Sequence, residues 1–263
     1  MRQRRILFYL ALGIAILFIF HSIFSEKKEV VKEEVLEIKE IFKVAIVLDD
    51  FGYNKINLSA LGDLTVPVTI AVLPNTPYSK TVSRFAEEKG IEVILHLPMQ
   101  PEGGNVPLEV DTVLVGMEDG EIRDIIGRAL DSVPFAKGIS NHMGSKATGD
   151  ARTMTIIFEE LKKRNMFFLD SFTSPDSVCG KIAEEKDVPC FQRDIFLDNS
   201  RETKKIEQCL INLVALKNNR NSAIGIGHDR MVTFEALKNI VPEMEKMGVK
   251  FVKLSDLADD KEK

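Results

Sequence analysis

Two adjacent aspartates follow an apolar run near the start of the main body of the chain. Residues 44–48, VAIVL, predict a short buried strand, and Gly52 and Asn54 predict a turn directly after it. Asp49 and Asp50 therefore lie where the strand ends. Because two carboxylates this close resist joint ionisation without a nearby cation, the pair indicates a general base beside a metal ligand. The alternative interpretation is that one aspartate only caps the following segment.

Three histidines complete a set of residues that could bind a metal and move protons. His96, His142 and His228 each follow a short apolar run that predicts a strand. Two imidazoles and one carboxylate with an open coordination position form a catalytic zinc site. We therefore expect Asp50, His96 and His142 to bind a divalent metal, with zinc as the first choice. Asp49 is then the general base, and His228 is the general acid that protonates the leaving nitrogen. A purely structural, hydrogen-bonded histidine is the alternative at each position.

Further polar side chains follow the same strands and are candidates for supporting this site. Arg193 is expected to orient Asp49 and keep it ionised, with a surface ion pair as the alternative. Asp194 is expected either to orient His228 or to cap a turn, and Asp198 is interpreted as part of a turn. The remaining candidates for ligand support or substrate contact are Asn141, Ser145, Asp170 and Ser171.

Strands and helices alternate from residue 41 onward. Strands are predicted at residues 44–48, 68–72, 93–95, 136–139, 167–169, 195–197, 223–226 and 251–254, and helices at 79–89, 120–132, 151–164, 203–217 and 233–247. This alternation predicts an α/β fold, a distorted (β/α) barrel of seven to eight mainly parallel strands. Because the carboxyl ends of barrel strands meet on one face, the candidate residues are expected to converge there.

The N-terminal residues predict a membrane anchor. Arg2, Arg4 and Arg5 precede an apolar run, residues 6–24, which as a helix is long enough for a hydrocarbon core of about 30 Å. We expect residues 1–25 to anchor the chain with the rest outside the cytoplasm, since positive charges stay inside. A cleaved signal peptide, which would release a secreted protein, is the alternative. The predicted domains that follow are a charged spacer (26–40), the barrel (41–257) and a charged tail (258–263).

Composition excludes several classes of function. The net charge is −5 and no basic cluster is interleaved with aromatic residues, which argues against nucleic acid as a partner. No glycine-rich phosphate-binding loop follows a strand, which argues against nucleotides. The absence of Trp excludes a carbohydrate platform of stacked indoles, although Phe and Tyr could serve. Cys179, Cys190 and Cys209 fit no metal-binding spacing, and both a Cys179–Cys190 disulfide and three buried thiols remain open.

Six ordered segments resemble those of the divergent polysaccharide deacetylase family, a distant branch of the NodB-type carbohydrate esterases. They are VAIVLDDFGYN, HLPMQP, GISNHMGSKAT, FFLDSFTS, FQRDIFLDN and GIGHDR, and the resemblance covers residues 42–257. It implies a distorted (β/α) barrel with a divalent metal, usually zinc, that hydrolyses N-acetyl groups on amino-sugar polymers. It also implies that Asp49 is the base, Asp50 a metal ligand, His228 the acid and Arg193 the arginine that tunes the base.

One departure from the standard enzymes shapes the functional hypotheses. Those enzymes carry both metal histidines in one His-Ser/Thr-x-x-x-x-His segment, which this chain lacks, so His96 and His142 must supply them from different loops. The leading hypothesis is a membrane-anchored deacetylase acting on peptidoglycan or another envelope polysaccharide. One alternative is a catalytically weak or inactive glycan-binding or envelope-organising protein that keeps the barrel and metal site. Another is a metal-dependent hydrolase of a different bond, such as a phosphoester.

Overall fold

The computed structural model describes residues 21, 41–104 and 106–258. The predicted anchor (1–25) and spacer (26–40) lie outside the described residues, apart from residue 21. Within the described part of the chain, no helix is long and apolar enough to cross a membrane. A single compact unit begins at Ile41, and it contains the predicted barrel.

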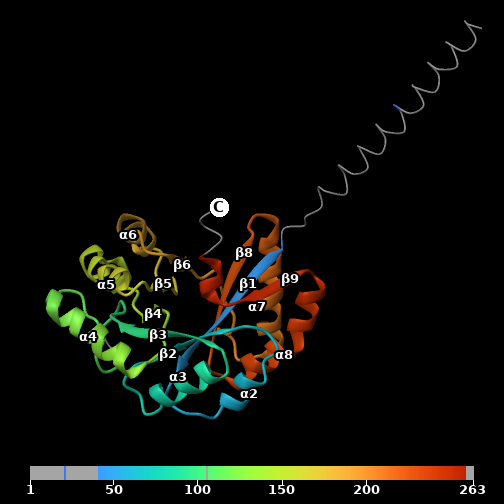
Figure 1. Ribbon diagram of the computed structural model, residues 1–263, viewed down its shortest axis with the longest axis horizontal. Coiled ribbons are helices and arrows are strands. Elements are labelled where there is room, and N and C mark those ends of the chain that lie inside the picture. The colour runs from blue at the N-terminus through green and yellow to red at the C-terminus, as the bar shows by residue number, and fades with distance from the viewer. Residues whose placement is uncertain (1–20, 22–40, 105, 259–263) are drawn as a thin grey trace, which may run out of the picture. The chain divides into compact units, whose positions relative to one another are not determined.

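A parallel sheet forms the centre of this unit (Figure 1). Its path is β6-β5-β4-β3-β2-β1-β8-β7, and β9 pairs with the first half of β1. Every strand pairing is parallel, as the alternation of strands and helices predicted. The strands are β1 (Phe42–Phe51), β2 (Thr69–Val72), β3 (Glu92–Met99), β4 (Gly138–Met143), β5 (Phe167–Asp170), β6 (Cys190–Gln192), β7 (Ile195–Phe196), β8 (Ser222–His228) and β9 (Val249–Val252).

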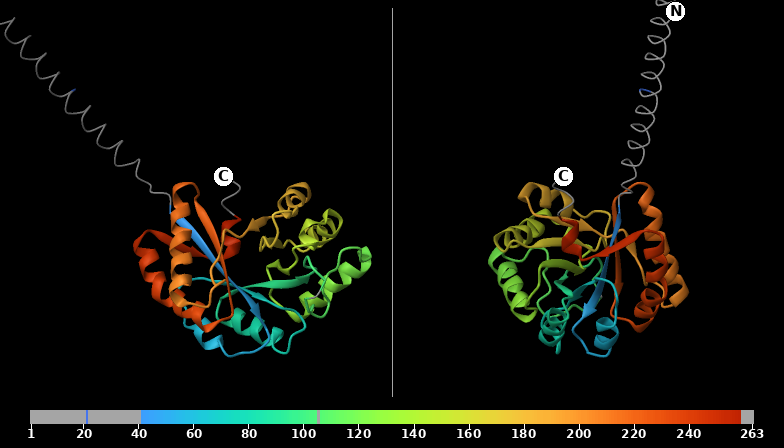
Figure 2. Two further views of the ribbon diagram at one scale, coloured as in Figure 1. Left: turned by 180° about the vertical axis from the view of Figure 1, so that it is seen from behind. Right: turned by 45° about the vertical axis from the view of Figure 1, so that its right-hand side comes forward.

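Helices cover the outer face of the curved sheet (Figures 1 and 2). The larger apolar core lies between this face and the helices, and a smaller core fills the inner side of the sheet. The five predicted helices are present, whereas the short α2 and α6 and strand β6 were not predicted. The helices are α2 (Leu58–Gly62), α3 (Ser79–Glu88), α4 (Asp119–Ser132), α5 (Ala151–Lys163), α6 (Cys179–Lys186), α7 (Thr203–Ala215) and α8 (Met231–Lys246).

The sheet is a half-barrel rather than a closed barrel, which corrects part of the prediction. Strands β6 and β7 contain only three and two residues, and they do not pair with each other. After Gln192 the chain leaves β5 and crosses to β8, where the Asp194 N–H donates to the Ile224 carbonyl at 2.9 Å. Residues 193–194 carry the chain from one edge of the sheet to the other without forming a strand. No ladder of backbone hydrogen bonds between β6 and β7 therefore closes the sheet.

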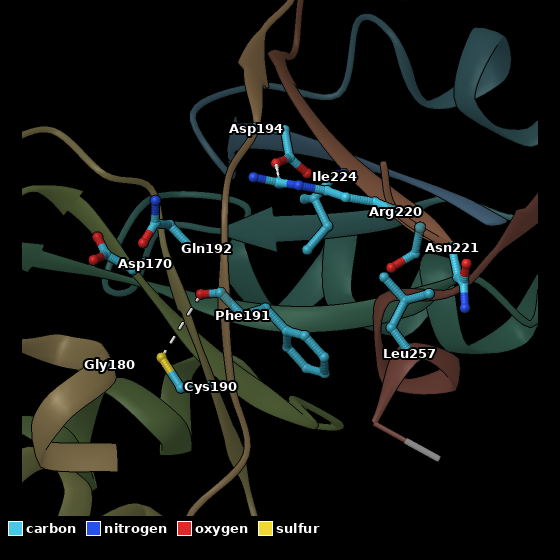
Figure 3. A pocket seen from close by; sticks show the side chains of 11 residues that line it. Asp170, Gly180, Cys190, Phe191, Gln192, Asp194, Arg220, Asn221, Ile224 and Leu257 are labelled. Atoms are coloured by element: carbon cyan, nitrogen blue, oxygen red, sulfur yellow. Dashed lines mark hydrogen bonds and ion pairs between the residues drawn. The ribbon is translucent and has the colours of Figure 1, made fainter. Parts of the chain in front are cut away.

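A cavity of about 470 Å³ lies at this opening, lined from one side by β5 and β6 and from the other by β8 (Figure 3). Phe191 and Leu257 point toward one another within it. Cys190 also lines the cavity, and no disulfide joins Cys179, Cys190 and Cys209 in the structure. The predicted disulfide is therefore absent, and the alternative of three buried thiols holds only for Cys179, because Cys190 and Cys209 are partly exposed. Burial raises the pKa of the Cys179 thiol.

Candidate active site

A bulge at the end of β1 brings two neighbouring carboxylates to one place. The register between β1 and β2 shifts between Leu48 and Phe51, and Asp50 has a left-handed backbone with φ of 66°. Successive side chains in a regular strand point to opposite faces. Here both carboxylates reach the same imidazole, since His96 Nε2 lies 3.6 Å from Asp49 Oδ2 and 3.4 Å from Asp50 Oδ1. The bulge therefore converts two adjacent sequence positions into one cluster of charge.

His142 completes a three-residue cluster whose members come from β1, β3 and β4. Its Nδ1 lies 3.2 Å from Asp50 Oδ1, and the His96 and His142 ring centroids are 5.0 Å apart. His96 lies on β3 and His142 on the adjacent β4. Asp50, His96 and His142 each offer one ligand atom, and these atoms all lie within 4.8 Å of one another. The structure thus brings together the three residues predicted to bind metal.

Two carboxylate oxygens of this site lack hydrogen-bond partners, and this indicates whether a divalent metal fits there. Asp49 Oδ1 and Asp50 Oδ1 are buried and have no hydrogen-bond partner. Buried carboxylate oxygens are rarely left this way, because the lost hydration is costly. Two imidazole nitrogens and a carboxylate oxygen are also ligands that zinc accepts. The Asp50 side chain is 34% exposed, so a cation held here would face solvent on one side. The residues present therefore fit a divalent metal.

Burial and charge shift the ionisation of the same residues. Burial alone would raise the pKa of Asp50, but His142 and His96 outweigh it and hold that pKa well below its usual range. Burial would lower the pKa of His96, yet the charges of Asp49 and Asp50 raise it. For Asp49, burial dominates and raises the pKa despite the opposing effect of His96. Asp49 and Asp50 are thus adjacent carboxylates with opposite shifts, which is the arrangement needed to separate a base from a ligand.

Ser140 orients His96, and sequence reasoning missed it. Its hydroxyl lies 2.8 Å from His96 Nδ1, and the side chain is fully buried. The contact arises because His96 and Ser140 are register partners on β3 and β4. With Nδ1 engaged in this way, Nε2 is the nitrogen that faces Asp50. The register of two parallel strands is not visible in the sequence, so no local signal pointed to this serine.

His228 is held by Asp198, which corrects the interpretation of that aspartate as only part of a turn. Asp198 Oδ1 lies 2.6 Å from His228 Nδ1, and Oδ2 accepts from the His228 backbone N–H at 2.9 Å and from the Thr233 hydroxyl at 2.7 Å. Burial would lower the pKa of His228, but Asp198 outweighs it and raises that pKa. Asp194 does not orient His228, because its carboxylate pairs with Arg220 and accepts from the Ile224 N–H.

Arg193 does not contact Asp49 as the sequence predicted. Its Nε donates to the Ser171 carbonyl at 2.7 Å and one terminal nitrogen donates to the Phe172 carbonyl at 2.9 Å. The guanidinium lies 3.7 Å from the ring centroid of Phe196, a cation–π contact. These partners come from the loop after β5 and from β7, so Arg193 ties together the two edges of the open sheet. The charge of Asp49 acts on it only from a distance.

The remaining predicted residues fix loops rather than imidazoles. Asn141 accepts from the Ser171 N–H at 2.8 Å and donates to the Met143 carbonyl at 2.7 Å, which joins the ends of β4 and β5. Asp170 accepts from the Phe172 N–H and from a serine hydroxyl, and it lines the cavity of Figure 3. Ser145 accepts from the backbone N–H of residue 102. The hydrogen bonds made by these four side chains therefore hold the loops around the metal cluster.

With this geometry established, comparison with known proteins assigns the family. The protein-family model of the divergent polysaccharide deacetylases matches residues 46–258. The chain belongs to this family. An uncharacterized protein of Haemophilus influenzae is 34% identical over 211 residues, covering 79% of this chain and 75% of that protein. The uncharacterized protein YibQ of Escherichia coli is 34% identical over 218 residues, covering 83% and 68%. The predicted resemblance to the divergent polysaccharide deacetylases is therefore confirmed.

Solved structures support the deacetylase fold. An uncharacterized protein from Agrobacterium tumefaciens is 25% identical, with a TM-score of 0.78 over 82% of this chain and 89% of that one. A Bacillus anthracis CE4 family pseudoenzyme, mutated to restore enzymatic activity, is 17% identical with a TM-score of 0.50, covering 82% and 67%. A deacetylase solved with its substrate is 14% identical with a TM-score of 0.52, covering 82% and 90%. The last two likenesses show the fold alone, which occurs in both a deacetylase and a pseudoenzyme.

Proposed function

We propose that this chain is a metal-dependent hydrolase that removes N-acetyl groups from an amino-sugar polymer. The observation that carries the proposal is the cluster of Asp50, His96 and His142, whose ligand atoms lie within 4.8 Å of one another. Asp49 lies against the same cluster, and its register partner on β8 is His228. Membership of the divergent polysaccharide deacetylases supports the choice of an amide on a glycan as the bond that is cleaved.

Asp50, His96 and His142 would hold a divalent cation, with zinc as the first choice. When bound, such a cation polarises the carbonyl of the substrate and lowers the pKa of water to about 7. The protein contributes the orientation of the ligands, because the β1 bulge aims Asp50 and the Ser140 hydroxyl turns His96. His96 and His142 come from the adjacent strands β3 and β4, and Asp50 comes from the end of β1, which β2 separates from β3, so the centre of the sheet sets their spacing.

Two groups beside the cluster would move the protons of amide hydrolysis. Asp49 is 2% exposed and has a raised pKa, so it is a stronger base than an ordinary aspartate toward the attacking water. His228 has a raised pKa and is engaged at Nδ1 by Asp198, so Nε2 donates the proton to the leaving nitrogen. One group accepts and the other donates, which is the pairing that breaking a C–N bond requires.

The proposed substrate is peptidoglycan or another N-acetylated polysaccharide of the cell envelope. The apolar run at residues 6–24, preceded by Arg2, Arg4 and Arg5, supports placing the enzyme outside the cytoplasm.

Acetate release tests this function. The purified full-length chain is incubated with zinc and N-acetylated glycans, and acetate is compared between the wild type and Asp49→Asn. We expect release that is proportional to enzyme, stops with a chelator, and falls by about a hundredfold or more in the variant. Equal release by Asp49→Asn would contradict the assigned base. A phosphoester substrate measured in parallel distinguishes an amide hydrolase from a hydrolase of another bond.

A second candidate is a glycan-binding protein that keeps the fold and the metal cluster without turnover. The position of Arg193 favours it, because this cation is bound to backbone carbonyls and makes no ion pair with Asp49 in the described part of the chain. The pseudoenzyme among the solved structures shares the fold. Saturable glycan binding without acetate release under any divalent metal would decide in favour of this candidate.

A further inference from the structure

The edge of the sheet opposite the metal cluster carries positive charge and exposed apolar side chains. Strands β1, β8 and β9 lie side by side and begin at this edge (Figure 1). We call the residues there the basic face: Ile41, Lys43, Lys217, Arg220, Lys246, Met247 and Lys250. Two of them are large apolar residues in contact with solvent, since Ile41 is 58% exposed and Met247 is 48% exposed. Positive charge around exposed apolar groups is typical of surfaces that lie on anionic membranes.

Backbone pairing and hydrogen bonds gather the basic face from separate segments. Lys43 of β1 is the register partner of Lys250 on β9, and its N–H donates to the Asn221 carbonyl, just before β8, at 2.9 Å. Lys217 Nζ donates to the Met247 carbonyl at 3.4 Å, which joins the segment before β8 to the end of α8. Positive charges of adjacent strands therefore lie side by side, an arrangement that a nearby anion stabilises.

The positive charge of the basic face exceeds its negative charge. Lys246 and Lys250 are exposed, and neither forms an ion pair with another residue that the structure describes. Arg220 pairs with Asp194, and Glu245 is an exposed carboxylate beside Lys246. Even with these two carboxylates counted, the five cations leave this face positive, whereas the whole chain carries a net charge of −5. The face is therefore a local exception to the charge of the protein.

We propose that the basic face lies against an anionic phospholipid surface. The chain itself favours lipid as the partner, because the residues before Ile41 include the predicted anchor, the apolar run at residues 6–24. Ile41 is thus the residue through which such an anchor joins the body. Anionic headgroups attract each lysine or arginine near the surface, and the long side chains reach them while Ile41 and Met247 enter the boundary of the acyl chains.

This contact sets the direction in which the active site faces. Strand β1 starts at the basic face and ends at the metal cluster, which contains Asp50. At about 3.3 Å per residue, the strand places Asp50 roughly 25–30 Å from Ile41. The metal cluster therefore lies on the side of the body away from the bilayer, where it meets polymer that stands above the lipid surface.

Methionine oxidation measures whether lipid covers the basic face. Met247 and Met231 are both 48% exposed and lie at opposite ends of α8, so Met231 is the internal control. The full-length chain is mixed with vesicles of phosphatidylcholine, alone or with phosphatidylglycerol, and treated with chloramine-T, and sulfoxide is quantified by mass spectrometry. We expect oxidation of Met247 to slow about fivefold with phosphatidylglycerol, while Met231 reacts as before. High salt should remove this protection, because it screens the charges.

Charge reversal tests whether the lysines carry the contact. Lys246→Glu/Lys250→Glu is expected to lose the protection of Met247. The matched control is Lys80→Glu/Lys238→Glu, which makes the same change in net charge at exposed residues of α3 and α8 outside the basic face and should keep the protection. Because residues 1–40 are identical in all these chains, a difference among them reports the basic face and not the predicted anchor.

Three results would overturn the proposal. Met247 that reacts equally fast with and without phosphatidylglycerol vesicles, or in the two double variants alike, would show that the face does not bind anionic lipid. Equal protection by phosphatidylcholine alone would show that charge plays no part. Protection without vesicles that grows with protein concentration would assign the face to a second copy of this chain. The oxidation needs neither zinc nor a glycan, so its outcome is separate from that of the acetate assay for the proposed function.

Discussion

Asp198 and His228 form a buried pair held by two contacts: Oδ1 lies 2.6 Å from the imidazole Nδ1, and Oδ2 accepts from the His228 backbone N–H at 2.9 Å. Asp198 is fully buried, and it follows β7, while His228 ends β8. The pairing of these two short parallel strands therefore fixes both the position and the tautomer of the imidazole. An imidazole held in this way at Nδ1 offers its Nε2 to a substrate.

The pH dependence of activity follows from this pair. Asp198 raises the pKa of His228 against the opposing effect of burial. In Asp198→Asn the burial remains and the charge is lost, so the pKa of His228 falls. Because His228 acts in its protonated form, the alkaline limb of kcat/KM moves to lower pH. A pH profile of acetate release checks this shift. Asp194→Asn is the matched control, since Asp194 pairs with Arg220 instead.

An unchanged alkaline limb in Asp198→Asn would mean that His228 is not the acid. A limb that shifts equally in Asp194→Asn would mean that the overall charge of this segment, rather than the direct contact, sets the pKa.

The residues at strand ends could be predicted from the sequence because that signal is local. Five apolar residues before Asp49 specify a buried strand whatever its neighbours are, and a shorter apolar run, residues 93–95, precedes His96. The stretch before His142, residues 136–139, is a weaker signal because Lys137 interrupts it. In a parallel sheet with crossover helices the carboxyl ends of the strands share one edge, so convergence of these residues followed from topology. The structure brings Asp50, His96 and His142 together for this reason.

The contacts of the site that depend on register or backbone conformation could not be predicted. Ser140 reaches His96 only through the pairing of β3 with β4, and Asp198 reaches His228 only through the pairing of β7 with β8. The left-handed backbone of Asp50 has no sequence signal beyond the turn that follows it. Arg193 was assigned to Asp49 from its place beside a predicted strand, but its loop turns the guanidinium to the Ser171 carbonyl. The prediction of a barrel was wrong about closure, because β6 and β7 are short strands that do not pair with each other.

Metal content distinguishes a ligand histidine from a histidine that only moves protons. His142 faces Asp50 Oδ1 within the three-residue cluster, whereas His228 is engaged by Asp198 outside it. We expect one tightly bound divalent ion per chain after dialysis against trace mixed metals, measured by elemental analysis. His142→Ala should lose this ion and His228→Ala should keep it. Retention of the ion by His142→Ala would contradict the ligand set.

Ser140 should affect metal affinity although it is not a predicted ligand. Its hydroxyl lies 2.8 Å from His96 Nδ1 and holds the ring so that Nε2 faces Asp50. Loss of such an orienting partner lowers metal affinity by about 10- to 100-fold, so Ser140→Ala should bind zinc more weakly in a competition titration against a chelator. Ser83→Ala removes an equally buried hydroxyl on α3 and is the control. Equal zinc affinity in the two variants would assign Ser140 only to packing.

The turn after Asp50 should tolerate no side chain at Gly52. This glycine has φ of 123°, and a Cβ there would lie 2.3 Å from the Thr76 hydroxyl oxygen and 3.2 Å from the Leu73 carbonyl. Both the backbone strain and the clash destabilise Gly52→Ala, by about 2 kcal/mol or more, and they displace the bulge that aims Asp50.

Gly127→Ala is the contrast: it lies inside α4 with no atom within 4 Å of the added Cβ. Replacing that glycine should stabilise the helix by about 0.5–1 kcal/mol. Thermal unfolding with and without zinc measures both variants. If Gly52→Ala lowers the melting temperature and also abolishes the increase that zinc gives, the turn positions the metal cluster. If zinc stabilises it as much as the wild type, the turn contributes to folding alone.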